Sequence, residues 1–356
     1  MDYKGKYKIF DPNKINTYPV RSRTNKLTLK DLVSPADVHK LDIKLSNEIR
    51  ICIQTIAQAI ASARKAGSPV VLFTGAHLIK NGLGPLLIDL INHGAVTLVA
   101  GNAATAIHDF ELALIGQTSE NVPYALGKGE FGMAYEFAYI NAAISVGNQE
   151  KLGFGEALGK MICDEDFHQQ VLGFPAAEDG GWGPLSRLEG VNLSDNFPHP
   201  EVSVLAACYK NDIPFTVHAG IGTDVTDQHP SFDGQAKGGC SGRDFLIFTN
   251  EVTALTNGGV FLNIASAVTG PEVFLKAVSM TANTGNVPRN IVTADFDLRD
   301  YDPKQMTDES SPGYYFRDQK SVVTRIPQAF AGKGYYIQGD QKQTFLLLYK
   351  MVLDRL

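Results

Sequence analysis

The chain alternates short apolar runs with longer segments of helical spacing, and this alternation constrains its fold more than any other feature. Runs such as SPVVLFTG and AVTLVAGN are apolar at consecutive positions, so both faces of each predicted strand are buried. Such strands occur in parallel sheets covered by helices. The sequence therefore predicts an α/β fold with an open, mostly parallel sheet and helices on both faces. The apolar runs are residues 68–75, 95–102, 213–220, 259–266 and 290–298.

Two segments lie outside or interrupt this alternation. Residues 1–43 are polar and irregular, and we expect an arm, a lid or a contact with another subunit. Residues 44–356 contain no linker rich in Pro, Gly and Ser, which predicts a single domain. A helical insert at about residues 117–198 separates two groups of strands, and we expect it to pack beside the sheet. The insert ends in a polar loop at residues 176–187.

Composition excludes several classes of protein. Hydrophobic residues make up 44% of the 356 positions, enough for a sizeable core. The net charge of −6 argues against nucleic acid or an anionic membrane as partner. There is no long apolar span, and the first residues lack the apolar core of a signal peptide. The cysteines are widely spaced and form no CxxC pair, so we expect reduced thiols in a cytoplasmic protein. From the charge and the lack of an apolar span we expect no nucleic-acid or membrane partner.

The loops that follow the apolar runs are rich in small residues with polar side chains between them. Ligands of open α/β sheets bind outside the carboxyl ends of the strands. Small residues allow close backbone approach there, and the helix that follows offers free N–H groups to phosphate. These loops predict a nucleotide or dinucleotide ligand. They are residues 74–82, 100–111, 218–230, 263–272 and 294–298.

Standard phosphate-binding motifs do not strengthen this prediction. GKGEFG, at residues 127–132, matches the G-x-G-x-x-G pattern but lies outside a strand–helix unit, and we interpret it as a coincidence. The G-x-x-x-x-G-K-[ST] pattern is absent.

Several ionisable side chains fall in or beside the loops. His108 and Asp109 begin a predicted helix, where a carboxylate either compensates the helix dipole or takes part in chemistry. Asp224, Asp227 and His229 could hold a divalent ion, with Asp233 nearby, or could form ordinary caps and turns.

A base and a nucleophile are also available. The imidazole of His218 or His229 could act as a general base, because histidine titrates near neutral pH. Lys320 lies among aromatic residues in YYFRDQKSVV, where desolvation could convert it into a nucleophile.

The order of the segments resembles the deoxyhypusine synthase family over about residues 69–325. LFTGAHLIKNGLGPLLIDLINHGAVTLVAGNAAT is similar to the family's first strand, its Asn-Leu turn, its helix and its Thr-Ala-Gly-Gly turn. VLAACYKNDIPFTVHAGIGTDV is similar to the Lys-Asn-x-Ile-Pro strand and its Ala-Leu-Thr-Asp-Gly-Ser loop, and NGGVFLNIASA to the triple-glycine strand. The matching residues are Leu78, Ile79, Gly82, Lys210, Asn211, Ile213, Pro214, Gly258, Gly259 and Val260.

The chain departs from the family where the family's chemistry lies. His77 stands in place of an asparagine, and Ile107-His108-Asp109 replaces a Glu-Glu-Asp run. Phe261–Ile264 replaces Pro-Lys-His-His, which removes a histidine tied to that chemistry. Lys320 has a place comparable to the family's catalytic lysine, but follows Asp318-Gln319 and not Trp-Gly. The resemblance implies a Rossmann-like NAD-binding fold and a homo-oligomer, with a reaction other than deoxyhypusine synthesis.

The residues and the resemblance together predict a cytoplasmic, NAD-dependent, transferase-like enzyme that forms a dimer or tetramer. The substrate is expected to be a small amine such as a polyamine. If the family's chemistry persists, NAD takes a hydride from a carbon beside nitrogen and Lys320 captures the imine. A metal-dependent hydrolase using residues 224–233 and a non-catalytic nucleotide-binding protein are the alternatives. The expected catalytic residues are His108, Asp109, Asp227, His229 and Lys320, and the expected cofactor-binding residues are Gly75, Ala76, His77, Leu78, Asn102, Ala103, Ala104, Thr105, Ala219, Gly220, Asp224, Gly258, Gly259 and Asp295.

Overall fold

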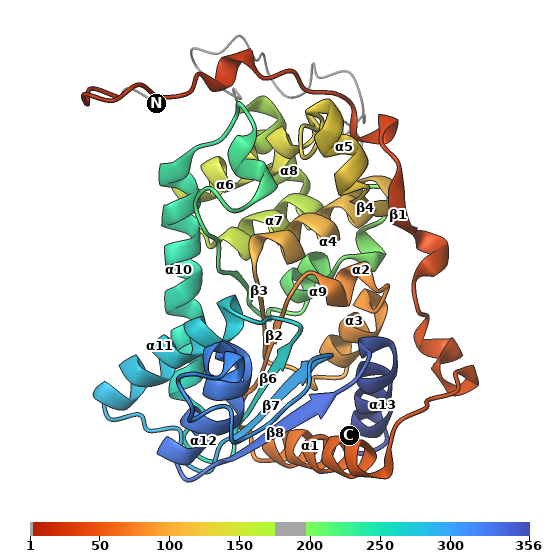
Figure 1. Cartoon of the computed structure of the whole chain (residues 1–356). Helices are drawn as coiled ribbons and strands as arrows, with labels where there is room; N and C mark the ends of the chain where they lie inside the picture. The colour runs from red at the N-terminus through yellow and green to blue at the C-terminus, as the bar shows by residue number, and fades with distance from the viewer. Residues whose placement is uncertain (1–2, 175–196) are drawn as a thin grey trace.

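The computed structural model describes residues 3–174 and 197–356, and a six-stranded parallel sheet lies at its centre (Figure 1). Five of its strands fall within the five apolar runs, which confirms the predicted α/β class and the open parallel sheet. The sixth strand, at one edge of the sheet, is less apolar and half-buried. The order across the sheet is β5 (Phe215–Val217), β3 (Leu98–Gly101), β2 (Val70–Thr74), β6 (Val260–Ile264), β7 (Val292–Asp297) and β8 (Lys333–Gln338).

Helices cover both faces of the sheet, and each face has its own apolar core, because side chains alternate between the faces of a strand. Figure 1 shows the two groups of helices on opposite sides of the strands. The first core is closed by α1 (Asn47–Lys65), α3 (Gly84–Asn92), α4 (Ala103–Ile115), α9 (Val204–Lys210) and α13 (Gln341–Leu353). The second is closed by α10 (Gly234–Thr253), α11 (Thr269–Asn283), the π-helical segment η9 (Gln319–Arg325) and α12 (Ile326–Ala329). Within the described residues, no helix combines the length and the apolarity needed to cross a membrane.

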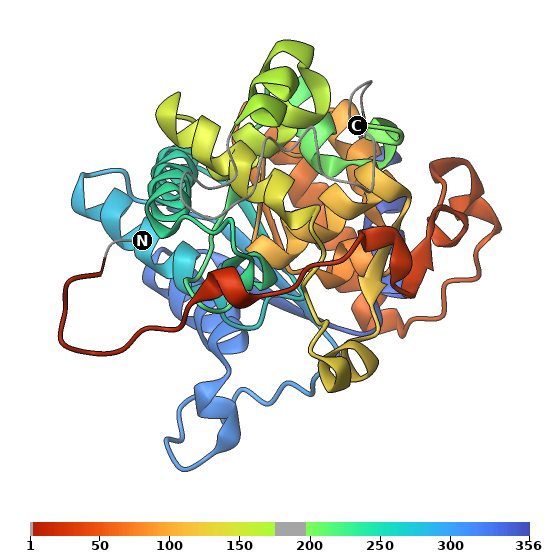
Figure 2. The ribbon, with the colours of Figure 1, turned by 90° about the horizontal axis from the view of Figure 1, so that it is seen from above.

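The N-terminal segment runs along the surface of its own chain. Figure 2 shows it crossing the molecule when seen from above. Its strand β1 (Asn25–Thr28) pairs antiparallel with β4 (Gln117–Glu120), which follows α4. The backbone N–H of Val20 donates to Oε2 of the buried Glu136 at 2.8 Å. Residues of the predicted arm are therefore held close to the helix that follows β3.

The helical insert packs beside the edge strand β5. It contains α5 (Val122–Lys128), α6 (Phe137–Gln149), α7 (Phe154–Cys163) and α8 (Glu165–Gly173). A Cβ atom at Gly155 would lie 1.8 Å from the Phe215 carbonyl oxygen, so α7 reaches the strand only because this residue is glycine. The polar loop at 176–187 lies outside the described residues.

Candidate functional site

The strand order identifies one position on the sheet where chain connections diverge. Numbered along the chain, the strands lie in the order third, second, first, fourth, fifth and sixth. The first strand, β2, and the fourth, β6, are neighbours, and successive strands lead away from them in opposite directions. This is the order of doubly wound dinucleotide-binding sheets, and ligands bind at such a switch point outside the carboxyl ends of the strands. The structure thus defines a doubly wound α/β protein with its topological switch point between β2 and β6.

The loops that leave β2 and β6 approach each other closely. The N–H of Gly75 donates to the Ile264 carbonyl oxygen at 2.9 Å. A Cβ atom on Gly75 would lie 2.1 Å from the carbonyl oxygen of Ala265, a residue with a positive φ of 50°. Glycine at position 75 is therefore required for the two loops to meet. Ala76 and the short helix α2 (His77–Lys80) follow, so the predicted residues Gly75, Ala76, His77 and Leu78 all stand at the switch point.

The turn after β3 is tied to the end of β2. Asn102 caps α4, and its Oδ1 accepts from the Thr105 N–H at 3.0 Å. The Thr105 hydroxyl lies 3.1 Å from the Thr74 carbonyl oxygen, at the last residue of β2. The predicted cofactor residues Asn102, Ala103, Ala104 and Thr105 are thus next to the turn at Gly75.

His108, one turn further along α4, belongs to a polar network. Its Nδ1 lies 2.7 Å from the Thr118 hydroxyl, which also contacts Glu111 Oε2. Glu111 pairs with Arg23 of the N-terminal segment, and the side chains of both are 5% exposed. His77 is the electrostatic neighbour of His108: partial desolvation of its ring lowers its pKa, and Lys80 and His108 lower the pKa further. Two imidazoles from successive strand-end turns therefore lie near each other.

Asp109 caps a neighbouring helix, which disfavours the catalytic role predicted for it. It is fully buried and accepts from the Ser203 hydroxyl at 2.6 Å and from the N–H groups of Val204 and Leu205 at 2.7 and 3.0 Å. These N–H groups begin α9, which Asp109 joins to α4. Burial raises the pKa of Asp109 to about 6, although these hydrogen bonds lower it. The preceding residue, His108, is on a different side of α4 and keeps 19% of its side chain exposed.

The loop after β5 is organised around a buried lysine. Lys237 of α10 is 2% exposed, and its Nζ lies 2.7 Å from Asp224 Oδ2, 3.0 Å from the Gly220 carbonyl oxygen and in contact with Asp227 Oδ1. Asp227 Oδ2 also accepts from the Gly222 N–H at 2.7 Å. The predicted cofactor residue Asp224 and the predicted catalytic residue Asp227 are therefore committed to an internal ion cluster.

The histidines of this loop are buried as neutral rings. Burial lowers the pKa of His229 to about 4, and its Nδ1 lies 2.7 Å from the Ser231 hydroxyl. Burial lowers the pKa of His218 to about 3, and its ring stacks on Phe73 at 5.6 Å and meets Phe248 edge-on. Both depressed pKa values reflect the cost of burying an imidazolium, which disfavours the predicted role of a proton-accepting base at neutral pH.

The described part of the chain holds no group of three or more His, Cys, Asp and Glu side chains placed to bind a metal ion. At residues 224–233 the physical reason is Lys237, whose ammonium group already pairs with the two nearest carboxylates. The geometry therefore gives no support to the metal-dependent hydrolase.

Asp295 lies in a buried network beneath the carboxyl ends of β6 and β7. It is 1% exposed, and its Oδ1 accepts from Asn263 Nδ2 at 2.7 Å. Burial and the nearby Asp318 raise its pKa well above the usual range. Arg299 pairs with Asp318, and its Nη2 lies 2.7 Å from Asp297 Oδ2. A contact between Asp295 and a cofactor stays a prediction.

Lys320 is the second residue of η9 and follows Asp318 of this network by two positions. Lys320 is 4% exposed, and its Nζ lies over the Tyr314 ring. Burial lowers the pKa of Lys320, and Arg325 and Arg317 lower it further. The expected desolvation among aromatic residues is present, and the role of nucleophile stays a prediction.

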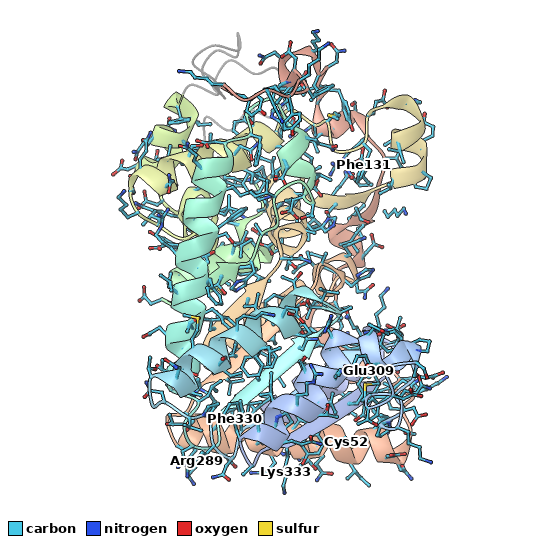
Figure 3. The ribbon with its side chains drawn as sticks, turned by 60° about the vertical axis from the view of Figure 1, so that its left-hand side comes forward. Cys52, Phe131, Arg289, Glu309, Phe330 and Lys333 are labelled. Atoms are coloured by element: carbon cyan, nitrogen blue, oxygen red, sulfur yellow. The ribbon has the colours of Figure 1, made fainter. Side chains whose placement is uncertain are left out.

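Gly258 and Gly259 lie at the wrong edge of the sheet for the role predicted. They precede Val260, the first residue of β6, and the Gly258 N–H donates to the Arg289 carbonyl oxygen before β7. Figure 3 shows Arg289 and Lys333, the first residue of β8, together at one end of the molecule. The amino ends of parallel strands lie opposite the edge at which ligands bind, which disfavours the predicted role of these glycines in cofactor binding.

Ala219 and Gly220 stand at the carboxyl end of β5, two strands from β2. At the usual spacing of strands this is roughly 10 Å away. A cavity of about 500 Å³ opens on the flank of the same strand, lined by residues of α7, α9 and α10 such as Gly155, Cys208 and Asp244. It is separate from the switch point.

Three residues of these networks were missed by sequence reasoning: Arg23, Thr118 and Lys237. Arg23 and Thr118 carry no local signal, because their partners are distant in the chain or in a different element. Glu111 stands three positions after His108, the spacing at which helical side chains meet, and this spacing was a usable signal.

No protein-family model matches the chain, and no curated protein matches it. Among solved structures, it is similar to a conserved putative LOR/SDH protein from Methanococcus maripaludis S2, with 16% identity, a TM-score of 0.47, and coverage of 90% of this chain and 74% of that one. It is also similar to ArgZ, an arginine dihydrolase from the ornithine-ammonia cycle in cyanobacteria, with 16% identity, a TM-score of 0.43, and coverage of 87% and 32%. It is similar as well to AgrE in a ternary complex with ornithine and NAD+, with 16% identity, a TM-score of 0.44, and coverage of 88% of this chain and 34% of that one. The chain spans about a third of the length of ArgZ and AgrE, and similarities this weak assign no function.

Proposed function

We propose that the chain is an NAD-dependent enzyme that acts on a small amine, with the dinucleotide at the carboxyl edge where β2 and β6 meet. The observation that carries the proposal is the strand order, which puts the switch point at Gly75 and Ala265. Dinucleotides bind at this position in sheets of this order. The resemblance of residues 69–325 to the deoxyhypusine synthase family supports NAD in particular, and a polyamine-like substrate.

The residues around the switch point fit such a ligand. The backbone of Gly75–Leu78 and of Asn102–Thr105 would line the dinucleotide, and small side chains leave it accessible. The N-terminus of α4, beside the end of β2, suits the pyrophosphate because its first N–H groups have no partner within the helix. Ala219 and Gly220 suit the far end of an extended ligand.

When bound, NAD supplies a hydride acceptor for a carbon that bears nitrogen. The residues of the chain have two tasks: to hold the amine and to take up the proton that leaves its nitrogen. Lys320, whose pKa is lowered by burial, would form a C=N bond to the oxidised carbon and release the substrate's original nitrogen as an amine, which would make the enzyme a transferase. Assembly into a dimer or tetramer belongs to the same proposal.

The test is calorimetric titration of NAD+ into the wild type, Gly75→Ala and Gly242→Ala. Both variants add one Cβ atom, but at Gly75 it meets the Ala265 carbonyl oxygen, whereas at Gly242 nothing lies within 4 Å. We expect Gly75→Ala to weaken NAD+ binding at least about tenfold, equivalent to about 1.4 kcal/mol, and Gly242→Ala to leave it unchanged.

Absence of NAD+ binding by the wild type at millimolar concentration contradicts the proposal. Binding without NAD+ reduction across a panel of polyamines and amino acids would favour the non-catalytic alternative instead. Circular dichroism of both variants establishes that they fold.

A further inference from the structure

A single hydroxyl group lies between Glu111 and His108. Thr118 Oγ1 contacts Glu111 Oε2 on one side and lies 2.7 Å from His108 Nδ1 on the other. Thr118 is fully buried, so both contacts are sheltered from water. Because a hydroxyl carries one proton, it can donate to only one of these two neighbours.

The charge of Glu111 decides which neighbour receives that proton. Burial alone would raise the pKa of Glu111, but the charge of Arg23 and hydrogen bonds from His108 and Thr118 lower it to about 2. An ionised carboxylate only accepts hydrogen bonds, so Thr118 must donate to Glu111. Thr118 Oγ1 can then only accept from His108, which requires a proton on Nδ1 of the imidazole.

We propose that Arg23, Glu111 and Thr118 hold His108 as the Nδ1–H tautomer, and that its Nε2 lone pair accepts the proton of the substrate's ammonium group. Arg23, Glu111 and Thr118 are positioning residues, and His108 is the catalytic residue. This inference rests on the proposed function for the identity of the reaction, whereas the tautomer follows from the hydrogen-bond network alone.

The remaining ring nitrogen is directed away from this network. Nδ1 is the His108 atom engaged with Thr118 and close to Glu111, at 3.5 Å, and within the described residues Nε2 has no hydrogen-bond partner. The side chain keeps 19% of its surface exposed. His77, two residues after Gly75, lies close enough for His108 to lower the pKa of its ring. His108 is therefore close to α2, the helix that follows the turn at Gly75, where the dinucleotide is proposed.

The proton and electron transfers balance with NAD+ as the only oxidant. The substrate's N–H bond breaks, and the proton goes to His108 Nε2, which leaves a neutral amine. With NAD+ bound, the nitrogen lone pair would form the C=N bond as the C–H bond breaks, and NAD+ would supply the hydride acceptor. The products are an iminium ion, NADH and a protonated His108, whose added charge faces Glu111 through Thr118.

Other charges also face this imidazole. Arg23 pairs with Glu111, and its Nη1 lies 4.0 Å from Glu120 Oε2. His77 and Lys80 belong to α2, and both Lys80 and His108 affect the pKa of His77. The N-terminal segment thus contributes to the site, because Arg23 is the cation that keeps Glu111 ionised.

The test is the tautomer of His108 in the full chain, measured by long-range ¹H–¹⁵N NMR with ¹⁵N-labelled histidine, without NAD or substrate. His108→Gln assigns the signal, and the exposed His39 is the control. We expect the Nδ1–H form for His108 and the ordinary mixture, mainly Nε2–H, for His39. Thr118→Ser should keep the Nδ1–H form, and Thr118→Val should lose it.

A wild-type His108 in the Nε2–H form overturns the inference even if Thr118→Val does not fold. A second readout is modification by diethyl pyrocarbonate, which reacts with an unprotonated imidazole nitrogen, followed by mass spectrometry. We expect carbethoxylation of His108 at Nε2, and complete protection of His108 while His39 reacts also overturns the inference. Neither measurement uses NAD, so failure of the proposed function through absent NAD+ binding is a separate result.

Discussion

Replacing the buried lysine of the loop after β5 tests whether residues 218–230 form an ion cluster that stabilises the fold. Lys237→Met keeps most of the side-chain volume but removes the ammonium group that contacts Asp224, Asp227 and the Gly220 carbonyl oxygen. Removing one partner of a buried ion pair costs about 3–5 kcal/mol, because the remaining charge is uncompensated. We therefore expect the free energy of unfolding, measured with urea at pH 7, to fall by about 4 kcal/mol.

The pH dependence of this variant gives the sharper result. Burial raises the pKa of Asp224, while Lys237 lowers it, so the variant raises this pKa further. Its folded state then binds more protons than its unfolded state, and the free energy of unfolding should rise as pH falls from 7 to 5. The wild type should show a smaller rise over that window.

Lys276→Met is the matched control, because Lys276 pairs with Glu272 one helical turn away on an exposed surface. Loss of an exposed pair of this kind should change the free energy of unfolding by about 0.5 kcal/mol or less. Adding Asp224→Asn and Asp227→Asn to Lys237→Met should restore part of the stability. Equal effects of Lys237→Met and Lys276→Met, or no pH dependence, would refute the reasoning.

Two further predictions concern buried carboxyl groups. Asp109→Asn replaces an acceptor of three hydrogen bonds at the start of α9 with a group that is half donor, and should lower the free energy of unfolding by about 2–3 kcal/mol; an unchanged urea midpoint contradicts this. Burial raises the pKa of Asp244 to about 7, although it accepts from the N–H groups of Val217 and Gly155. Because the folded pKa exceeds the unfolded value, Asp244 should increase stability as pH falls from 7 to 4, and Asp244→Asn should flatten that slope in urea unfolding. An identical slope in the variant would show that Asp244 is not the group responsible.

The strands were predictable because their cause is local. A strand buried on both faces needs consecutive apolar residues, and such runs are visible in the sequence alone. The loops at the carboxyl ends of β2, β3 and β5 were located by the same reasoning, together with His77 and His108 beside the switch point. The expectation for Gly258 and Gly259 came from the resemblance to the triple-glycine strand and not from the loop positions, and in the structure both residues precede β6.

The roles of individual polar side chains required the tertiary structure. Asp109 and His108 are adjacent in sequence, yet one caps a neighbouring helix and the other lies beside the turn after β2. In the sequence Asp224 and Asp227 resemble metal ligands, whereas in the structure both carboxylates pair with Lys237. The sequence by itself determined the class of fold, because consecutive apolar residues mark strands buried on both faces, and it predicted the loops at the carboxyl ends of those strands as the place for a ligand. Only the tertiary structure decided the strand order and the partner of each charged group, because residues such as Arg23 and Glu111 meet through folding across 88 positions and leave no local pattern.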